Sequence, residues 1–222
     1  KSGAQALFKS LRETKLMSPP TDCVVPIGEE LMLKGLQRGV KADFYTTVTR
    51  PPAVYRGNPF VIEAGLAYGG DLPPDAPIRL LRFANRVPLL YQQSACATAR
   101  AAASLNWRSY GLSQSQGQIP IGPMILMIHV ASVWVPFTSE SKEAVAHYPE
   151  ILKQIKLALQ ECGRRLGAFL SKRAHAERES KRLSIFQRYI GEVAQAVGHI
   201  LESDPAPLRD QLLAIAQKAT TL

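Results

Sequence analysis

The sequence lacks the short motifs that mark the common catalytic sites. It contains no GxxxxGK[ST] loop to hold nucleotide phosphates, no GxGxxG turn, no GxSxG nucleophile turn and no HExxH metal pair. Its four histidines, His129, His147, His175 and His199, have no partner at metal-ligand spacing. We therefore predict no catalytic residue and no metal site in this chain, and we favour a binding or signal-transmitting module over an independent enzyme.

Cysteine is scarce, and long apolar runs are missing. The three cysteines, Cys23, Cys96 and Cys162, are far apart and form no CxxC pair. This predicts reduced thiols in an intracellular protein, either cytoplasmic or associated with the nucleoid. No apolar run reaches the roughly 18 residues that a membrane-spanning helix needs, so we expect no membrane partner. The chain begins at Lys1 without an initiator Met or a signal peptide, so we expect it to be part of a longer protein.

Acidic residues are outnumbered. The 27 Lys and Arg stand against 18 Asp and Glu among 222 residues, a net charge of +9. Such a surplus favours a polyanionic partner, nucleic acid before an acidic membrane. Residues 151–190 hold ten Lys and Arg against three Glu, which is most of the excess. A solvated basic face on a long helix explains this region better than duplex binding along its whole length.

The hydrophobic periods predict an α+β fold, in which a four-stranded sheet carries a helix on one face. His129 lies in the last predicted strand, where a lone histidine is usually a hydrogen-bonded strand residue rather than a ligand. The predicted elements are a helix at 4–14, a break at 19–22, a helix at 29–36, strands at 43–49, 60–68 and 78–90, an alanine-rich helix at 94–105, a loop at 113–122 and a strand at 123–135.

From Pro149 the period becomes helical and can continue to about Leu201. Residues 150–190 alone would form a helix about 60 Å long. Gly163, Gly167 and Gly191 are expected to weaken or bend it, and residues 203–207 to end it before a short helix at 208–219. A helix this long cannot bury its whole apolar stripe on one small domain, so its far end should contact a partner.

Several longer motifs follow one another in the order and spacing of a known family. Together they resemble the family of the DNA topoisomerase VI B subunit, and the resemblance covers at least residues 15–190. The motifs are Pro-Pro-Thr-Asp-Cys at 19–23, Pro-Ile-Gly-Glu-Glu at 26–30, Tyr-Arg-Gly-Asn-Pro-Phe at 55–60, Arg-Phe-Ala-Asn-Arg-Val-Pro-Leu-Leu-Tyr at 82–91 and Val-Pro-Phe-Thr-Ser-Glu-Ser-Lys at 135–142.

The resemblance implies a division into four parts. Residues 1–40 resemble the end of a helix–two-turns–helix domain, and residues 41–149 resemble a GHKL-type transducer domain with a left-handed βαβ crossover. Residues 150–202 resemble the stalk helix, and residues 203–222 a segment that contacts the A subunit. The ATPase domain, which holds ATP and Mg in the full protein, is absent, so the fragment alone should bind no cofactor and be inactive.

The resemblance also implies a function. The fragment would relay ATP binding and hydrolysis to the DNA-cleaving A subunit during duplex passage, relaxation and decatenation by a type IIB topoisomerase, an isomerase. Its partners would be the A subunit, a second B subunit in an A2B2 heterotetramer, and double-stranded DNA. The alternative is an ATP-independent DNA-binding or scaffolding component of a meiotic double-strand-break complex.

Two sites follow from the resemblance. Lys142 matches a loop lysine that contacts the ATP γ-phosphate in the full protein; by itself it would be an ordinary loop lysine. Trp107, Arg108 and Tyr110 match a Trp-Lys-x-Tyr motif that touches DNA, with Arg in place of Lys. Judged by the residues alone, it is equally plausible that Trp107 caps the hydrophobic core and Arg108 is solvated.

Arg82, Asn85 and Arg86 place two cations and an amide within one predicted strand. They could face a ligand or a neighbouring domain. We favour the other interpretation, a network at the sheet edge that fixes the domain's own loops.

Overall fold

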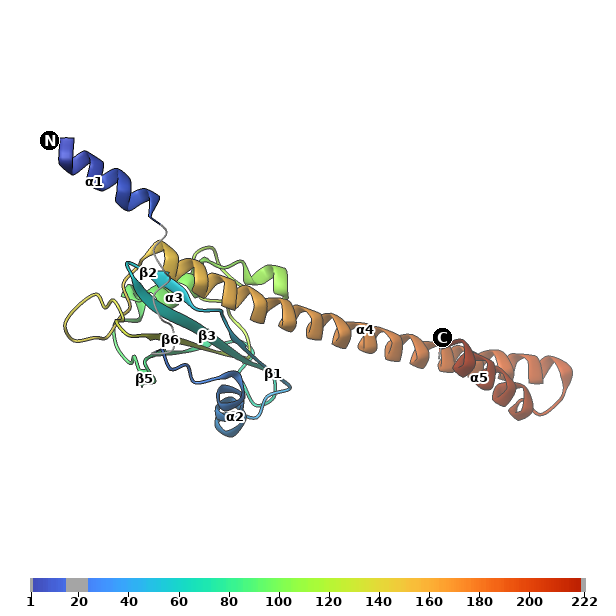
Figure 1. Cartoon of the computed structure of the whole chain (residues 1–222). Coiled ribbons are helices and arrows are strands. Elements are labelled where there is room, and N and C mark those ends of the chain that lie inside the picture. The colour runs from blue at the N-terminus through green and yellow to red at the C-terminus, as the bar shows by residue number, and fades with distance from the viewer. Residues whose placement is uncertain (1, 15–23, 221–222) are drawn as a thin grey trace. The chain divides into compact units, whose positions relative to one another are not determined.

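A computed structural model of the chain describes residues 2–14 and 24–220 (Figure 1). The predicted break at 19–22 and Cys23 lie outside the described residues. The chain divides into two compact units, Lys1–Gly167 and Ala168–Leu222, so the boundary falls inside a helix. The four-part division implied by the resemblance stays a prediction.

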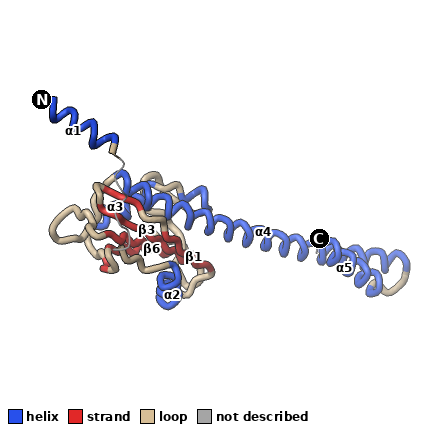
Figure 2. Tube along the Cα trace, viewed as in Figure 1, coloured by secondary structure: helices blue, strands red, loops and turns tan. Residues whose placement is uncertain are grey.

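The first unit is built on a mixed sheet with the strand order β1-β3-β6-β4-β5. Figure 2 shows the strands of this sheet in red. Its four longer strands are β1 (Phe44–Thr49), β3 (Asn58–Tyr68), β6 (Met124–Ser132) and β4 (Arg79–Ala84). β1, β3 and β6 pair antiparallel, whereas β4 pairs parallel to β6. The α+β class and the four main strands are confirmed. The helix α3 lies between the parallel strands β4 and β6 in the sequence. The left-handed crossover stays a prediction.

Two hairpins differ from the expectation. The predicted strand at 78–90 is broken, because Asn85 and Arg86 adopt φ values of 46° and 68° and turn the chain into the short β5 (Val87–Pro88). Positive φ at both central residues is the geometry of a two-residue type I′ hairpin. Arg56 and Gly57 form a second turn of this kind, with φ values of 47° and 80°. This turn pairs the short strand β2 (Ala53–Tyr55) with the start of β3.

Helices cover both faces of the sheet. Thr46 and Thr47 of β1 are neighbours in sequence and so face opposite sides. Thr46 accepts a hydrogen bond from Arg165 of α4 (Pro149–Leu201), and the Thr47 hydroxyl donates to the Glu29 carbonyl of α2 (Glu29–Gly39). The prediction of a helix on one face of the sheet is confirmed by α3 (Ala97–Ser104), which lies on the same side as α4, while α2 covers the other face (Figure 1).

The long helix begins and ends where the sequence predicts. α4 has 53 residues and runs through Gly163, Gly167 and Gly191 without a break in its assignment. Its apolar stripe is buried in the first unit at Ile151, Ile155, Leu159 and Leu166. Within the remaining elements, α1 spans Ser2–Glu13 and α5 spans Ala206–Thr220.

Two of the three cysteines lie within the described residues. Cys96 and Cys162 are free and buried, and burial raises the pKa of the Cys162 thiol to about 12, so it stays a neutral core side chain. Over the part of the chain that the structure describes, none of the helices combines the length and apolarity required to cross a membrane.

Candidate functional site

The loop that carries Lys142 joins β6 to α4 and is closed at its base by backbone hydrogen bonds. The Thr138 amide donates to the Ala144 carbonyl (2.9 Å) and the Ala146 amide donates to the Pro136 carbonyl (2.8 Å). Residues 136–146, which we call the lysine loop, therefore form a short antiparallel hairpin rather than an open connection.

Lys142 lies near the tip of the lysine loop. Its φ of 56° is left-handed, which is uncommon for a residue with a side chain, and its amide donates to the Ser139 carbonyl. The Ser139 and Ser141 hydroxyls are hydrogen-bonded to each other at 2.7 Å. Lys142 is exposed at the loop surface, and it has no carboxylate partner among the described residues. The turn thus leaves an unpaired ammonium available to an anion from elsewhere.

The base of the lysine loop is fixed to the N-terminus of α3. The Ala97 amide donates to the Val145 carbonyl (2.8 Å), and the Val145 amide donates to the Cys96 sulfur (3.4 Å). Ala144 and Val145 are completely buried. Three residues later, Tyr148 stacks on Tyr55 with ring centroids 4.3 Å apart, directly before α4 begins. A displacement of the loop base must therefore move against both α3 and the start of α4.

The Trp107–Tyr110 motif forms a 3₁₀ turn just after α3. Trp107 is completely buried, and its indole N–H donates to the Ala102 carbonyl at 2.8 Å. The indole has no exposed surface to offer a ligand, which favours the core-packing alternative for Trp107. Arg108 is exposed. The DNA contact of the motif stays a prediction, and in this geometry Arg108 is the residue able to make it.

Tyr110 of the same turn packs on two glycines of α4. A methyl group at Gly163 would lie 2.5 Å from the Tyr110 ring, whereas one at Gly167 would lie 3.7 Å from the Tyr110 Cα. The ring also meets Trp107 edge-on, with centroids 6.0 Å apart. Both glycines were expected to be weak points of the helix. Their i, i+4 spacing instead puts them on one face of it, where Gly163 makes room for the Tyr110 ring.

Replacing Gly163 by alanine should lower the free energy of unfolding by up to about 2 kcal/mol. The new methyl group displaces the Tyr110 ring, a strain of about 1–3 kcal/mol, and better helix propensity offsets about 1 kcal/mol of it. Gly167→Ala is the matched control, because the same propensity gain comes with an ordinary contact, so it should be neutral or stabilising. Urea denaturation of the two variants measures the difference. Equal stabilisation by both would show that the Tyr110 ring yields freely.

A buried polar network connects four segments of the first unit. Glu63 and His129, opposite each other on β3 and β6, are completely buried, with the His129 Nδ1 2.7 Å from the Glu63 carboxylate. The amides of Ile27 and Gly28 each donate to that carboxylate at 2.7 Å. The Arg86 amide donates to His129 Nε2, so Nδ1 carries the proton that His129 shares with Glu63.

Burial by itself would raise the pKa of Glu63, but the hydrogen bonds from His129, Ile27 and Gly28 outweigh it and lower the pKa below its usual range. Glu63 is therefore an ionised carboxylate that holds the segment before α2 onto the sheet. The prediction that His129 is a hydrogen-bonded strand residue is confirmed. Its partner Glu63 was not predicted from the sequence.

The second network confirms the favoured interpretation of the Arg82–Arg86 region. The Asn85 side chain donates to the Ser132 carbonyl and accepts from the Ser132 amide, both at 2.9 Å, which ties the β4–β5 turn to the end of β6. The Arg82 guanidinium donates to the Tyr91 carbonyl, and the Arg86 guanidinium donates to the Pro26 carbonyl. These residues fix the domain's own loops.

The family model and the curated relatives that match this chain name the same family. The family described as topoisomerase VI B subunit, transducer, matches residues 19–182. The chain is 49% identical over 201 residues to the B subunit of type 2 DNA topoisomerase 6 from Methanosarcina mazei, covering 90% of this chain and 32% of that protein. It is 44% identical over 216 residues to the protein of the same name from Natronomonas pharaonis, covering 97% and 27%.

The chain thus spans about a third of the length of the curated relatives it matches. Among solved structures, the 43K ATPase domain of Thermus thermophilus gyrase B in complex with an aminocoumarin aligns with a TM-score of 0.39 and 15% identity, over 70% of this chain and 45% of that one.

Proposed function

The chain belongs to the family of the type 2 DNA topoisomerase 6 B subunit, and on that basis we propose that it relays the nucleotide state of the full protein to the A subunit. The whole enzyme would be a type IIB topoisomerase that passes one DNA duplex through another. This chain would act as its transducer, between an ATPase domain that holds ATP and Mg and the partner that cleaves DNA.

The observation that carries the proposal is the display of Lys142. The hydrogen-bonded turn holds its unpaired ammonium near the tip of a loop whose base is fixed to α3 and to the start of α4. An unpaired cation suits a phosphate, because a charge-assisted hydrogen bond forms when the phosphate is present and is lost when it leaves. The loop can therefore favour one domain orientation over another, depending on the nucleotide.

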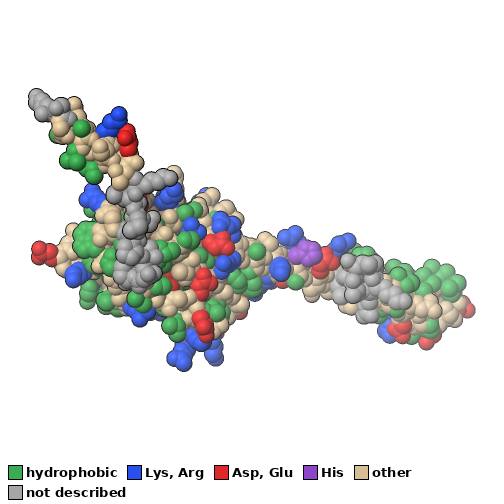
Figure 3. Space-filling view, in the orientation of Figure 1, with side chains coloured by type: hydrophobic (Ala, Val, Ile, Leu, Met, Phe, Trp, Pro, Cys, Tyr) green, Lys and Arg blue, Asp and Glu red, His purple; other side chains and the backbone are tan. Residues whose placement is uncertain are grey.

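The second unit supports the proposed contact with the A subunit. Large apolar side chains are exposed on the last part of α4, namely those of Ile185, Phe186, Tyr189, Val193, Ile200 and Leu201. Figure 3 shows hydrophobic side chains at the surface of this unit. Apolar clusters of this kind mark protein interfaces. A second copy of the B subunit would complete the heterotetramer.

Lys142→Ala in the full-length protein, assembled with the A subunit, should slow ATP-dependent relaxation of supercoiled DNA about tenfold or more. A charge-assisted hydrogen bond contributes about 1.5–3 kcal/mol, and 1.4 kcal/mol corresponds to a factor of ten in rate. Lys153→Ala, which removes an exposed lysine from the first turns of α4, is the matched control and should relax DNA at the normal rate. DNA binding without nucleotide should be unchanged in both variants.

Relaxation at the wild-type rate by the Lys142→Ala enzyme would contradict the relay through this lysine. It would instead favour the alternative in which the protein binds DNA or scaffolds a complex independently of ATP. Lys142→Arg refines the result, because it keeps the cation and should retain more activity than Lys142→Ala.

A further inference from the structure

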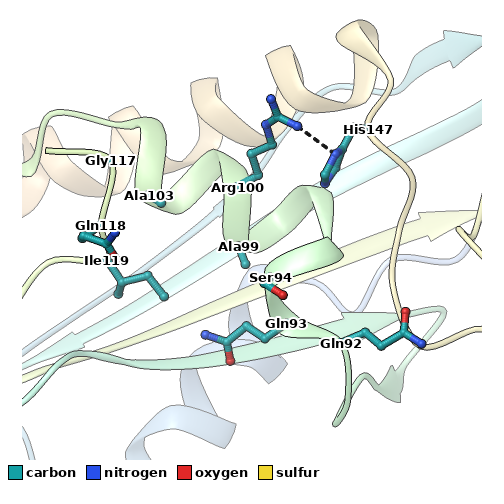
Figure 4. Close-up of a pocket in the computed structure, with 10 residues that line it drawn as sticks. All are labelled: Gln92, Gln93, Ser94, Ala99, Arg100, Ala103, Gly117, Gln118, Ile119 and His147. Atoms are coloured by element: carbon teal, nitrogen blue, oxygen red, sulfur yellow. Dashed lines mark hydrogen bonds between the residues drawn. The ribbon is translucent and has the colours of Figure 1, made fainter.

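Two adjoining cavities run along the exposed side of α3, and both have Ala103 and Gly117 in their walls. We call them together the α3 trough. The larger, about 820 Å³, is shown in Figure 4, and the smaller is about 370 Å³. Polar groups line the larger cavity at Gln92, Gln93, Ser94, Arg100, Gln118 and His147, and the smaller one at Ser104, Asn106, Arg108, Gln114, Ser115 and Gln116. No Asp or Glu is among the described lining residues of either cavity.

The two arginines of the α3 trough contact a histidine ring and a backbone carbonyl. The Arg100 guanidinium lies 3.2 Å from His147 Nδ1, a contact drawn in Figure 4, and the Arg108 Nε donates to the Gln114 carbonyl at 2.7 Å. Neither has a carboxylate partner within the described ranges, 2–14 and 24–220. On α4, by contrast, Arg164, Arg165 and Arg173 pair with glutamates of the same helix. The trough therefore keeps two uncompensated positive charges.

We propose that the α3 trough binds the sugar-phosphate backbone of duplex DNA, with Arg100 as a phosphate contact in addition to Arg108. The proposal rests on the proposed topoisomerase function, and it extends the DNA surface from the turn after α3 along the length of that helix. Nothing in the Trp-Arg-Ser-Tyr motif points to Arg100, which lies one turn into α3.

The chemistry of the lining fits a backbone better than a base edge or a small acid. Arginine, glutamine, asparagine and serine side chains are the usual donors to phosphate and sugar oxygens, which carry no sequence information. Two neighbouring cavities that share wall residues suit an extended ligand, and a lining without carboxylates among the described residues avoids repulsion of successive phosphates. Arg100 lies one turn into α3 and Arg108 lies in the turn that follows α3, so two separate phosphates can each meet one guanidinium.

The experiment uses the assembled heterotetramer and a short fluorescent DNA duplex, with anisotropy measured over a series of salt concentrations. Arg100→Ala should weaken binding about three- to tenfold and lower the slope of log K against log salt by about one. Gln118→Glu places a carboxylate in the trough without touching the Arg100–His147 contact, and it should weaken binding by a similar factor. Arg38→Ala is the charge-matched control, since Arg38 is exposed on α2 across the sheet, and it should leave both quantities unchanged.

The outcomes separate the two proposals. Suppose that the wild-type enzyme relaxes DNA, and that Arg100→Ala and Gln118→Glu have the same DNA affinity and salt slope as the control Arg38→Ala. The trough proposal is then wrong, and the proposed function stands. If those two variants instead lose affinity for the A subunit, the occupant is an acidic protein segment and the DNA assignment is overturned. If the wild-type assembly neither binds nor relaxes DNA, the proposed function itself fails.

Discussion

Glu63→Ala should lower the free energy of unfolding of this chain by about 3–5 kcal/mol, because it leaves several hydrogen-bond donors inside the domain without their acceptor. The substitution removes the acceptor for the Ile27 and Gly28 amides and for the His129 ring, and each buried donor left without a partner costs about 1–3 kcal/mol. Urea denaturation followed by circular dichroism measures the loss. The segment before α2 should also become more accessible to proteases, because Glu63 holds it to the sheet.

Two controls make the result specific. Glu30→Ala removes an exposed carboxylate that pairs with Lys34 on the same helix, so it should change stability by less than about 0.5 kcal/mol. Glu63→Gln keeps the shape but not the charge, and it should give an intermediate loss. A loss below about 1 kcal/mol for Glu63→Ala would show that the network contributes little beyond packing.

The same carboxylate gives a pH signature with a defined sign. The folded-state pKa of Glu63 is lowered, so its contribution is complete above the unfolded-state value of about 4.3 and is lost as the pH falls through the folded-state value. The difference in stability between the wild-type chain and Glu63→Gln should therefore narrow below about pH 4. A gap that stays constant into acid would mean that the charge of Glu63 is not what the network stabilises.

The helices and the main strands could be predicted because their signals are local. The long apolar period from Pro149 fixed the start of α4, and the apolar run around His129 marked β6. The predicted continuation of the strand from 85 to 90 was wrong because Asn85-Arg86 is a weak turn signal beside Asn-Gly. The left-handed backbone of Asn85 is held by Ser132, more than forty residues away. Single-sequence reasoning has no access to such a distant partner.

The functional and structural sites also differ in how much of their signal is local in the sequence. Lys142 could be proposed only through its resemblance to a family motif, since an isolated lysine in a loop carries no signal. Glu63 and His129 are 66 positions apart and meet because the β3–β6 register sets them opposite each other, which neither residue specifies alone. The position of Trp107 just after an alanine-rich helix is itself a signal for burial, because the small alanine side chains leave room for an indole.

Trp107→Ala should cost about 3–5 kcal/mol of stability, as expected when a completely buried indole is replaced by a methyl group. It leaves a cavity beside α3, removes the hydrogen bond to the Ala102 carbonyl and takes away the edge contact of Tyr110. Thermal and urea unfolding of the chain measure the loss. Trp107→Phe keeps part of the volume and should lose less, which separates cavity formation from the hydrogen bond.

The stability result decides how a DNA-binding defect at this motif is interpreted. In the assembled enzyme, a loss of affinity in Trp107→Ala follows from a displaced turn, because the indole lies inside the domain, whereas a loss in Arg108→Ala reports on a surface charge. Arg108→Ala should therefore leave the unfolding free energy within about 0.5 kcal/mol of wild type while lowering DNA affinity and its salt slope. If Trp107→Phe keeps full stability but loses DNA affinity as Trp107→Ala does, the indole must leave the core to meet DNA, and the assignment of Trp107 to packing is wrong.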